Sequence, residues 1–390
     1  MKIAFHIPRM NWYRVLSSLI DAALNRGHQV ECWHNRGAKL KENTPTIKKL
    51  PFFLNGRPEI VEYDKPEDII TLVNSRPIDI IIDLHPPRYP EIRSIKQRNR
   101  GKPLWILIDL PPSDCIMDIR NEEQLYGCDK FIVCNEYYLE NSIRMITQDK
   151  EEVLEYVNEN RELLGMSAVE WVKDSFMFQW TDQHVRYLRD NVLISGNSAF
   201  DVINHIKPED VRKKWEIDRS TPIVSLLPCP FGYDPTASWE QMFMKDSPIS
   251  RIKWMVKHGS FKCFPHLFNY PSNRDVVRSL KQFASKNGAL LIAKKKHSLP
   301  VTPELARYCD RIVGDDNFYP HTALELFSVS NLVVGFYSFG AIEAAALNIH
   351  YLNVVVPNFP WKFYCDMRTP IHNCEPYDGV ISSMTATELI

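Results

Sequence analysis

The chain has 390 residues, more than a single hydrophobic core usually holds, so two domains are expected. Its apolar fraction of 44%, charged fraction of 24% and formal net charge of -1 are those of an ordinary globular protein and give no global attraction to nucleic acid. Nine cysteines without a CxxC pair favour free thiols in a reducing compartment over disulfides or a zinc site.

Hydrophobic patterning also indicates the cellular compartment in which to expect the protein. No apolar stretch approaches the roughly 18–20 residues that a membrane-spanning helix needs. The sequence opens on a strand-like segment and shows no secretory signal. We therefore expect a cytoplasmic protein without a nucleic-acid partner.

The first half of the chain alternates short apolar runs with helical patterns, which predicts βαβ units around a parallel sheet. The first helix follows a loop at Pro8–Tyr13 and is predicted to bury one face. That face consists of Val15, Leu16, Leu19, Ile20 and Ala23. The strands predicted in this half are Lys2–Ile7, Gln29–Trp33, Ile78–Leu84, Leu104–Leu110 and Lys130–Cys134.

A second alternating series begins after about residue 198. Its predicted strands are Pro222–Leu227, Ala289–Ala293, Arg311–Val313, Leu332–Gly335 and Tyr351–Val355. Its predicted helices are Arg274–Lys286, Thr322–Val329 and Ala341–Leu347, and Thr385–Ile390 resembles a first helical turn. The pattern predicts an α/β protein with two Rossmann-like domains, an N-terminal domain at 1–198 and a C-terminal domain at 199–390.

Acidic and imidazole side chains stand at or just beyond the strand ends of the first half. His85, Asp109 and Glu136 are the leading candidates, and Asp83 and Asp114 share their placement. Ligands of open α/β sheets bind outside the carboxyl ends of the strands, where a transferase needs a base to deprotonate a hydroxyl. A carboxylate there can equally cap the next helix, so both interpretations stay open.

The strongest pattern of the second half is the strand Leu332–Gly335, which runs through a short loop into a helix. Ser338 and Gly340 lie where the helix begins, and Glu343 falls in its first turn. The free amides and positive dipole end of a helix suit a diphosphate, which a glycine lets approach the backbone. In the alternative interpretation Ser338 is an N-cap and Glu343 is its capping partner.

Two groups of cations are candidates for phosphate contacts. Lys296 and His297 follow a predicted strand, where positive charge can stabilise a departing diphosphate. Arg9 and Arg14, in and after the first loop, could face the same group. A lysine run is also typical of a solvated loop, and the two arginines could be ordinary surface charges.

The turn between residues 314 and 322 is a candidate for recognition of a base. The backbone of the turn, near Asp316 and Thr322, could pair with the edge of the base, while the ring of Tyr319 stacks on the base. The alternative is a plain strand–turn–helix connection with Pro320 at the start of the helix.

The segment Ile194–Ile203 contains a Ser-Gly-Asn-Ser element, followed by the basic run 212–214 and the strand Pro222–Leu227. This arrangement resembles the Gly-Asn element near the domain junction of GT-B-fold enzymes, especially the UDP-GlcNAc 2-epimerases and related sugar transferases. The stretch 289–356 is similar to the donor-binding half of the CDP-glycerol glycerophosphotransferase and GT-B group. The resemblance implies two Rossmann-like domains that face a cleft.

The resemblance also implies donor contacts. Lys296 and His297 would bind phosphates. Ser338, Phe339 and Gly340 would cradle the diphosphate. Glu343 would lie near the ribose or the transferred group. The basic element departs from the Lys-Pro-His-Pro of these families, and the first loop lacks the Gly-Thr-Arg-Pro of the 2-epimerases, which argues against epimerase activity. No EX7E signature follows Glu343, which favours inverting transfer.

The implied function is a glycosyltransferase that moves a sugar or related group from a nucleotide-activated donor to an acceptor hydroxyl, in bacterial-type surface polysaccharide or glycoconjugate synthesis. The acceptor would be a saccharide, a lipid-linked molecule or a protein, and no cofactor or metal is required. The alternatives are a nucleotide-sugar epimerase or hydrolase and a non-catalytic GT-B scaffold.

Residues 230–272, with Trp254 and Lys257, could line an acceptor site, contact a membrane surface peripherally or belong to the core.

Overall fold

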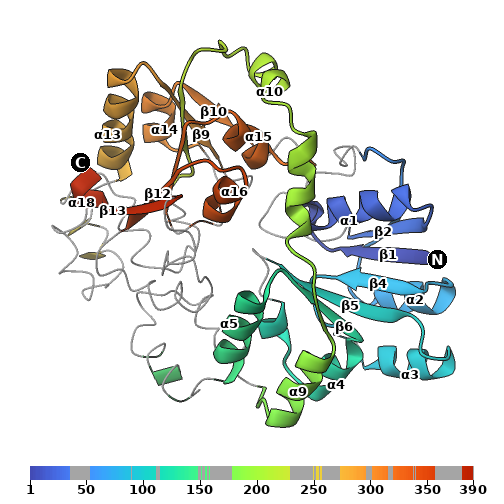
Figure 1. The fold of residues 1–390 in the computed structure, drawn as a ribbon. Coiled ribbons are helices and arrows are strands. Elements are labelled where there is room, and N and C mark those ends of the chain that lie inside the picture. The colour runs from blue at the N-terminus through green and yellow to red at the C-terminus, as the bar shows by residue number, and fades with distance from the viewer. Residues whose placement is uncertain are drawn as a thin grey trace. The chain divides into compact units, whose positions relative to one another are not determined.

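The computed structural model describes residues 1–35, 53–88, 90–110, 115–147, 178–228, 273–295, 301–314, 319–336, 340–355 and 380–389, with single residues between 151 and 158, between 249 and 256, and at 338. These residues form two compact units. The first unit comprises Met1–Gln148, Asp174–Val202 and Asn317–His321, and the second comprises the rest of the chain. Figure 1 shows a parallel sheet flanked by helices in each unit.

The described strands of the first unit form a seven-stranded parallel sheet. They are β1 (Lys2–Ile7), β2 (Gln29–Asn35), β3 (Glu59–Tyr63), β4 (Ile80–Asp83), β5 (Leu104–Asp109), β6 (Lys130–Val133) and β7 (Val192–Ile194). Their order is β3-β2-β1-β4-β5-β6-β7. The chain thus builds one edge from β1 to β3 and then returns to add β4 on the other side of β1. Between β1 and β4 lies a topological switch point, the position at which Rossmann sheets bind ligands.

The first βα unit shows why the local sequence folds as predicted. Ala4, Phe5 and Ile7 of β1 are fully buried, as expected of a central parallel strand. The predicted apolar face of α1 (Tyr13–Asn25) is confirmed, although Leu19 is only half-buried. The helix ends where Gly27 adopts a φ of 72°, a conformation that glycine tolerates at a helix C-terminus.

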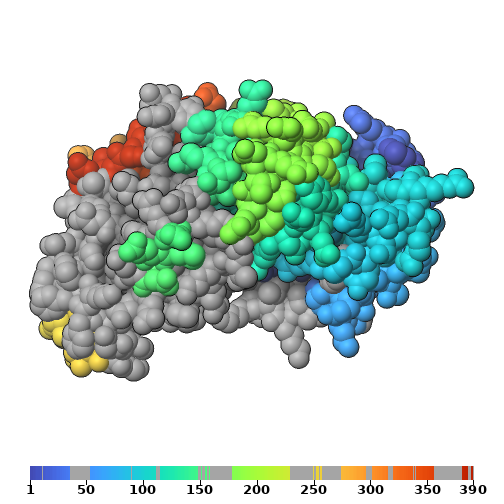
Figure 2. Space-filling model, turned by 90° about the horizontal axis from the view of Figure 1, so that it is seen from below, coloured from blue at the N-terminus to red at the C-terminus, as the bar shows by residue number. Residues whose placement is uncertain are grey.

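The remaining described helices of the first unit are short. They are α2 (Asp68–Ser75), α3 (Glu91–Arg98), α4 (Glu122–Gly127), α5 (Glu136–Thr147) and α9 (Asp182–Asp190), with 3-10 turns η1 (Met10–Trp12) and η3 (Ile116–Asp118). A further 3-10 segment, η4 (Ser198–His205), begins in the first unit and ends in the second. An ion pair between Arg189 and Glu140 joins α9 to α5, and the rings of Tyr187 and Tyr126 join α9 to α4 at 4.9 Å. In Figure 2 the yellow-green surface of this later segment adjoins the green surface of α4 and α5.

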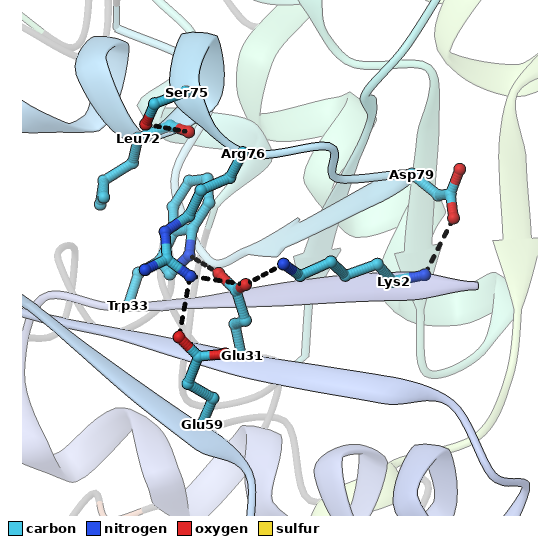
Figure 3. Close-up of polar contacts among 8 residues, drawn as sticks. All are labelled: Lys2, Glu31, Trp33, Glu59, Leu72, Ser75, Arg76 and Asp79. Atoms are coloured by element: carbon cyan, nitrogen blue, oxygen red, sulfur yellow. Dashed lines mark hydrogen bonds and ion pairs between the residues drawn. The ribbon is translucent and has the colours of Figure 1, made fainter.

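A network of charges ties together the amino ends of the strands in the first unit (Figure 3). The buried carboxylate of Glu31 on β2 accepts hydrogen bonds from Lys2 Nζ at 2.6 Å, Arg76 Nη1 at 2.7 Å and Trp33 Nε1 at 2.8 Å. Arg76 also pairs with Glu59 on β3. Burial by itself raises the pKa of Glu31, but the bonds from Lys2, Trp33 and Arg76 lower it overall.

Replacement of Glu31 by glutamine is expected to lower the free energy of unfolding by about 2 kcal/mol at pH 7, because two cations lose their charge partner. The folded state lowers the pKa of Glu31, so its stabilisation is complete above the unfolded value and is lost as the pH falls through the folded value. Urea unfolding should therefore show the difference between wild type and Glu31→Gln shrinking on acidification.

Glu59→Gln is the matched control for this experiment. The side chain of Glu59 contacts the same Arg76 but is 57% exposed, so its removal should cost less than about 0.5 kcal/mol. Equal losses in the two variants, or a Glu31→Gln difference that grows on acidification, would contradict the argument.

The described strands of the second unit form a six-stranded parallel sheet. They are β8 (Ile223–Leu226), β9 (Leu290–Lys294), β10 (Arg311–Val313), β11 (Leu332–Gly335), β12 (Tyr351–Val355) and β13 (Ile381–Thr385), in the order β10-β9-β8-β11-β12-β13. This order repeats that of the first six strands of the first unit. The switch point of this sheet therefore lies between β8 and β11.

Helices cover both faces of the second sheet (Figure 1). One face carries α13 (Asn273–Lys286), α14 (Pro303–Tyr308) and α18 (Ala386–Leu389), and the other carries α10 (Pro208–Lys214), α15 (Thr322–Ser328) and α16 (Gly340–Ala346). Successive strand residues serve opposite faces: Val224 packs in the first core and Ile223 in the second. Burial on both faces explains the continuous apolar runs of these strands.

The structure confirms the predicted α/β class and two Rossmann-like sheets. The predicted boundary between residues 198 and 199 lies between the last strand of the first sheet and the first strand of the second. Three strands were not predicted, namely β3, β7 and β13. The predicted loop 230–272 lies outside the described residues apart from a few positions between 249 and 256.

Candidate functional site

Polar side chains meet at the switch point of the first sheet. His6 is near the end of β1, and Asp83 ends the neighbouring strand β4. Their side chains are bonded, with His6 Nδ1 2.7 Å from Asp83 Oδ2. The other oxygen of Asp83 accepts the backbone N–H of His85 at 2.9 Å. Asp83 is only 2% exposed, so this carboxylate fixes both histidines from inside the unit.

His6 has a second partner on β3, and an aromatic ring lies beside both histidines. Nε2 of His6 is 2.6 Å from the hydroxyl oxygen of Tyr63, the last residue of β3. The indole of Trp12 meets the ring of His85 edge-on at 4.6 Å between centroids and that of His6 at 6.3 Å. Three strands and the first loop therefore contribute to one cluster.

The sequence-predicted base His85 is itself held by a carboxylate. Its Nδ1 lies 3.2 Å from Asp118 Oδ2, and its side chain is 26% exposed. Burial acts to raise the pKa of Asp118, but the neighbouring imidazole of His85 and the charges of Arg88 and Arg120 lower it overall. Asp118 is therefore a carboxylate at neutral pH, and it lies within ion-pair distance of the imidazole.

Asp109 and Glu136 occupy different environments at the same edge. Asp109 ends β5 and is fully buried, and its Oδ1 accepts the backbone N–H of Cys115 at 2.5 Å. Glu136 is exposed in the first turn of α5, whose N-terminus is capped by the Asn135 side chain through Tyr138 N–H at 2.7 Å. Asp109 thus holds a loop, and the catalytic roles of Asp109 and Glu136 stay predictions.

The turn after β11 lies at the switch point of the second sheet. The Ser338 hydroxyl accepts the Gly340 N–H at 3.2 Å, and the Ser338 carbonyl accepts the Ala341 N–H at 3.0 Å. Ser338 therefore acts as a helix cap, as its alternative interpretation predicted. These two amides are already bonded within the turn, and a ligand role for Ser338 stays a prediction.

The two glycines of this region are required by packing. A Cβ on Gly340 would collide with Leu227 Cδ1, and a Cβ on Gly335 would collide with the hydroxyl of Tyr351. Close packing on Leu227 accounts for Gly340 without a ligand. The predicted approach of a phosphate to Gly340 is not tested by this geometry.

Other predicted donor contacts of the second unit are buried or lie outside the described residues. Glu343 is buried in the first turn of α16, and Thr322 is buried at the start of α15. The Thr322 hydroxyl makes no hydrogen bond within the described part of the chain. The predicted contacts outside the described residues are Lys296, His297, Asp316 and Phe339.

Tyr319 belongs to the first unit, in contrast to the other predicted donor contacts. Its hydroxyl donates to Asp21 Oδ2 at 3.1 Å, and its ring lies 6.0 Å from that of Phe53. Burial and then the charge of Asp21 raise the pKa of Tyr319 to about 12. Tyr319 therefore packs as part of the fold here, and its stacking on a base stays a prediction.

The two predicted arginines lie near the first cluster in the chain. Arg9 is half-buried, and its carbonyl accepts the N–H of Trp12 at 3.0 Å. Arg14 is half-buried in the first turn of α1. Their predicted phosphate contacts are not tested by the structure.

Sequence reasoning missed His6, Tyr63, Trp12 and Asp118. His6 was hidden inside an apolar strand pattern, although a histidine next to the last residue of a first parallel strand is a usable signal. Tyr63 belongs to a strand that was not predicted.

Within the described ranges no group of three or more histidine, cysteine, aspartate or glutamate side chains could hold a metal ion. No described helix combines the length and apolar character needed to cross a membrane.

No family model and no curated protein matches this chain significantly. Among solved structures, the UDP-GlcNAc 2-epimerase of Neisseria meningitidis bound to UDP-GlcNAc is 10% identical, with a TM-score of 0.53 over 100% of this chain and 89% of that one. The UDP-GlcNAc 2-epimerase of Methanocaldococcus jannaschii is 10% identical, with a TM-score of 0.51 over 100% and 90%. The wall teichoic acid polymerase TagF is 8% identical, with a TM-score of 0.50 over 93% and 71%.

These similarities concern the fold, because the identities are too low to carry residue roles. Two Rossmann-like sheets with the same strand order, together with these neighbours, give the chain a GT-B-like fold. The expected fold is thereby confirmed.

Proposed function

We propose that the chain is a glycosyltransferase that transfers a sugar or related group from a nucleotide-activated donor to an acceptor hydroxyl. The observation that carries the proposal is the His6–Asp83–His85–Asp118 cluster at the switch point of the first sheet. This is the place where open α/β sheets bind their ligands. The GT-B-like fold gives the second Rossmann sheet a nucleotide-binding role by analogy.

The geometry of His85 suits a general base. Asp118 engages Nδ1, which leaves Nε2 for the proton of the acceptor hydroxyl. Proton transfer to Nε2 as the hydroxyl attacks the donor would give an imidazolium next to the Asp118 carboxylate, which stabilises it. A direct attack of this kind inverts the anomeric configuration, as the sequence favoured.

In this proposal the second unit holds the donor. The start of α16 with Ser338 and Gly340 takes the diphosphate, Glu343 lies near the ribose or transferred group, and the cations of the loop after β9 balance the departing charge without a metal. Lys294, the last residue of β9, is buried at that edge. The reaction is assigned to the cytoplasm and to surface polysaccharide or glycoconjugate synthesis.

One observation favours a second candidate, a nucleotide-sugar epimerase or hydrolase. The first sheet carries two separate histidine–carboxylate pairs, whereas transfer to an acceptor requires a single base. Incubation with the donor alone, followed by product analysis, separates the two functions. A transferase leaves most of the donor intact without acceptor, whereas an epimerase or hydrolase converts it.

Thermal unfolding with a panel of UDP-, CDP- and CMP-linked donors tests the proposed donor binding. A donor at 100 times its Kd should stabilise the protein by about 2.7 kcal/mol, which raises Tm by several degrees. Ser338→Ala should weaken that donor at least about tenfold, because it removes a hydroxyl from the diphosphate turn.

Ser328→Ala is the matched control for Ser338→Ala. The Ser328 hydroxyl bonds the Glu325 carbonyl at 2.7 Å at the far end of α15, so its loss should leave donor affinity unchanged. The absence of stabilisation by every nucleotide would refute the donor assignment and favour a non-catalytic scaffold.

A further inference from the structure

Two exposed arginines lie beside the His85–Asp118 pair. Arg88 comes three residues after His85 in the loop that follows β4, and Arg120 comes two residues after Asp118, beyond η3. Both segments follow neighbouring strands at the carboxyl edge of the sheet, because β4 pairs with β5. The pair itself is accessible to solvent, with the side chains of His85 and Asp118 26% and 22% exposed.

Short chain connections keep both arginines close to the pair. The three residues from His85 to Arg88 span at most about 11 Å, and the two from Asp118 to Arg120 at most about 7 Å. Burial acts to raise the pKa of Asp118, but the imidazole of His85 and the charges of Arg88 and Arg120 lower it overall. Charges act on a carboxylate in this way over distances of several ångströms. Both guanidinium groups therefore lie around the same carboxylate.

The charges of this group do not cancel. Asp118 supplies one negative charge, whereas Arg88 and Arg120 supply two positive charges. In the proposed transfer His85 takes up the proton of the acceptor, which adds a third positive charge. An anionic group of a bound ligand would offset this excess at the moment of reaction.

Neutralisation of Asp118 does not by itself account for two arginines. The carboxylate already lies 3.2 Å from His85 Nδ1. The acidic side chain that follows Arg120 in the chain, Glu122, has another partner, with its Oε1 3.1 Å from His184 Nε2. A guanidinium group offers parallel N–H donors that fit a carboxylate or a phosphate. Two of them at a ligand-binding edge suit an acidic ligand.

We propose that Arg88 and Arg120 bind an anionic group of the acceptor, a phosphate or a carboxylate, and so place a hydroxyl of the same molecule next to His85. The inference rests on the proposed function for the reaction and adds the class of acceptor to it. That class comprises sugar phosphates, polyol phosphates and uronic acids. The two arginines are acceptor-binding residues, and His85 keeps its role as the base.

Binding of small acceptor fragments to the full chain tests the proposal without any turnover. The acidic probes are glycerol 3-phosphate, glucose 6-phosphate and glucuronate, and the uncharged counterparts are glycerol, glucose and methyl glucuronate. Calorimetry should give at least one acidic probe a Kd at least about tenfold below that of its counterpart. The phosphate and glucuronate arms show which anion the site prefers. The same affinity for charged and uncharged probes, or no binding of an acidic probe at millimolar concentration, overturns the proposal.

Substitution of the arginines locates the preference. Arg88→Gln and Arg120→Gln should each remove most of it, and Arg88→Lys should restore only part, because lysine keeps the charge but lacks the planar fork. Arg98→Gln is the matched control, since Arg98 is exposed at the other end of α3, where it donates to Asn74 Oδ1 at 3.4 Å. Its affinity for every probe should equal that of the wild type. An equal loss in Arg98→Gln would mean non-specific attraction and would overturn the site.

Kinetics with the donor identified by the nucleotide panel and the tightest acidic probe as acceptor test the role in transfer. Arg88→Gln and Arg120→Gln should raise KM for the acceptor about tenfold or more, with kcat and KM for the donor within about twofold. A rise in KM for the donor instead assigns the arginines to the donor and overturns the proposal, as does an unchanged KM for the acceptor. An anion preference that depends on Arg88 in a protein that binds no nucleotide instead defeats the proposed transferase and leaves the anion site standing.

Discussion

Replacement of His85 by glutamine is expected to lower kcat/KM for transfer by about 10²–10⁴-fold, because the acceptor hydroxyl would lose the proposed general base. The backbone N–H of His85 would still bond Asp83, so the loop should keep its shape and the free energy of unfolding should change little. Steady-state kinetics and urea unfolding on the same preparation check both statements.

His28→Gln is the control for this substitution, because His28 lies in the turn before β2 at the opposite end of the strands. Asp118→Asn should give a smaller loss of about ten- to a hundredfold, since the imidazole stays but is less well oriented. The fold lowers the pKa of Asp118, so its carboxylate persists into mildly acidic solution and this loss should persist there as well. A His85→Gln enzyme with wild-type kcat/KM would rule out the base assignment.

Replacement of Gly335 by alanine is expected to lower the free energy of unfolding of the second unit by about 2–3 kcal/mol. The added Cβ would overlap the hydroxyl of Tyr351 and press on Leu227 at 3.3 Å. Tyr351 is completely buried and cannot swing away, so the strain must be taken up by β11 or β12. Denaturant unfolding followed by tryptophan fluorescence measures the loss.

Gly340→Ala provides the comparison. Its Cβ would meet the terminal methyl of Leu227, a flexible side chain, so the cost should be near 1 kcal/mol. In the double variant Gly335→Ala/Tyr351→Phe, removal of the clashing hydroxyl should recover part of the loss, which a double-mutant cycle reports as a positive coupling. A Gly335→Ala loss below about 0.5 kcal/mol, the size of a neutral surface change, would show that the region is not tightly packed.

Most strands with a mainly apolar pattern were predictable, whereas β3 and β13, which carry polar residues, and the three-residue strand β7 were not. Lys2–Ile7, Arg311–Val313, Leu332–Gly335 and Tyr351–Val355 begin and end as predicted. In β3 two glutamates flank the apolar residues, and β13 has the mainly polar sequence Ile-Ser-Ser-Met-Thr. Their neighbours in the sheet supply the burial and pairing that local propensity does not show.

The candidate site was predictable only in part, because its residues become neighbours through strand order. His85 could be found from its place after a strand, whereas His6 gains meaning only when β4 is placed beside β1, 77 residues away from Asp83 in the chain. Tyr319 also has a partner that is distant in the chain. Its hydroxyl donates to Asp21, 298 residues distant, which no local pattern could have indicated.

Gly340 shows that two different physical requirements can call for the same residue type. The sequence suggested that glycine lets a phosphate approach the backbone, which stays a prediction, and the structure shows Leu227 packed against the same position. Both requirements forbid a side chain, so the pattern alone cannot separate them. Only the position of the neighbouring strand does so.

The ion-pair network and the proposed catalytic cluster lie at opposite ends of the first sheet. Glu31, Lys2 and Arg76 form ion pairs at the amino end, whereas His6, His85 and Tyr63 gather where the strands terminate. Directed evolution of the first unit can therefore randomise residues at the carboxyl ends of the strands, while the ion pairs at the amino ends keep the unit folded. Libraries confined to the loops after β1 and β4 should yield a high fraction of folded members and a wide range of acceptor preferences.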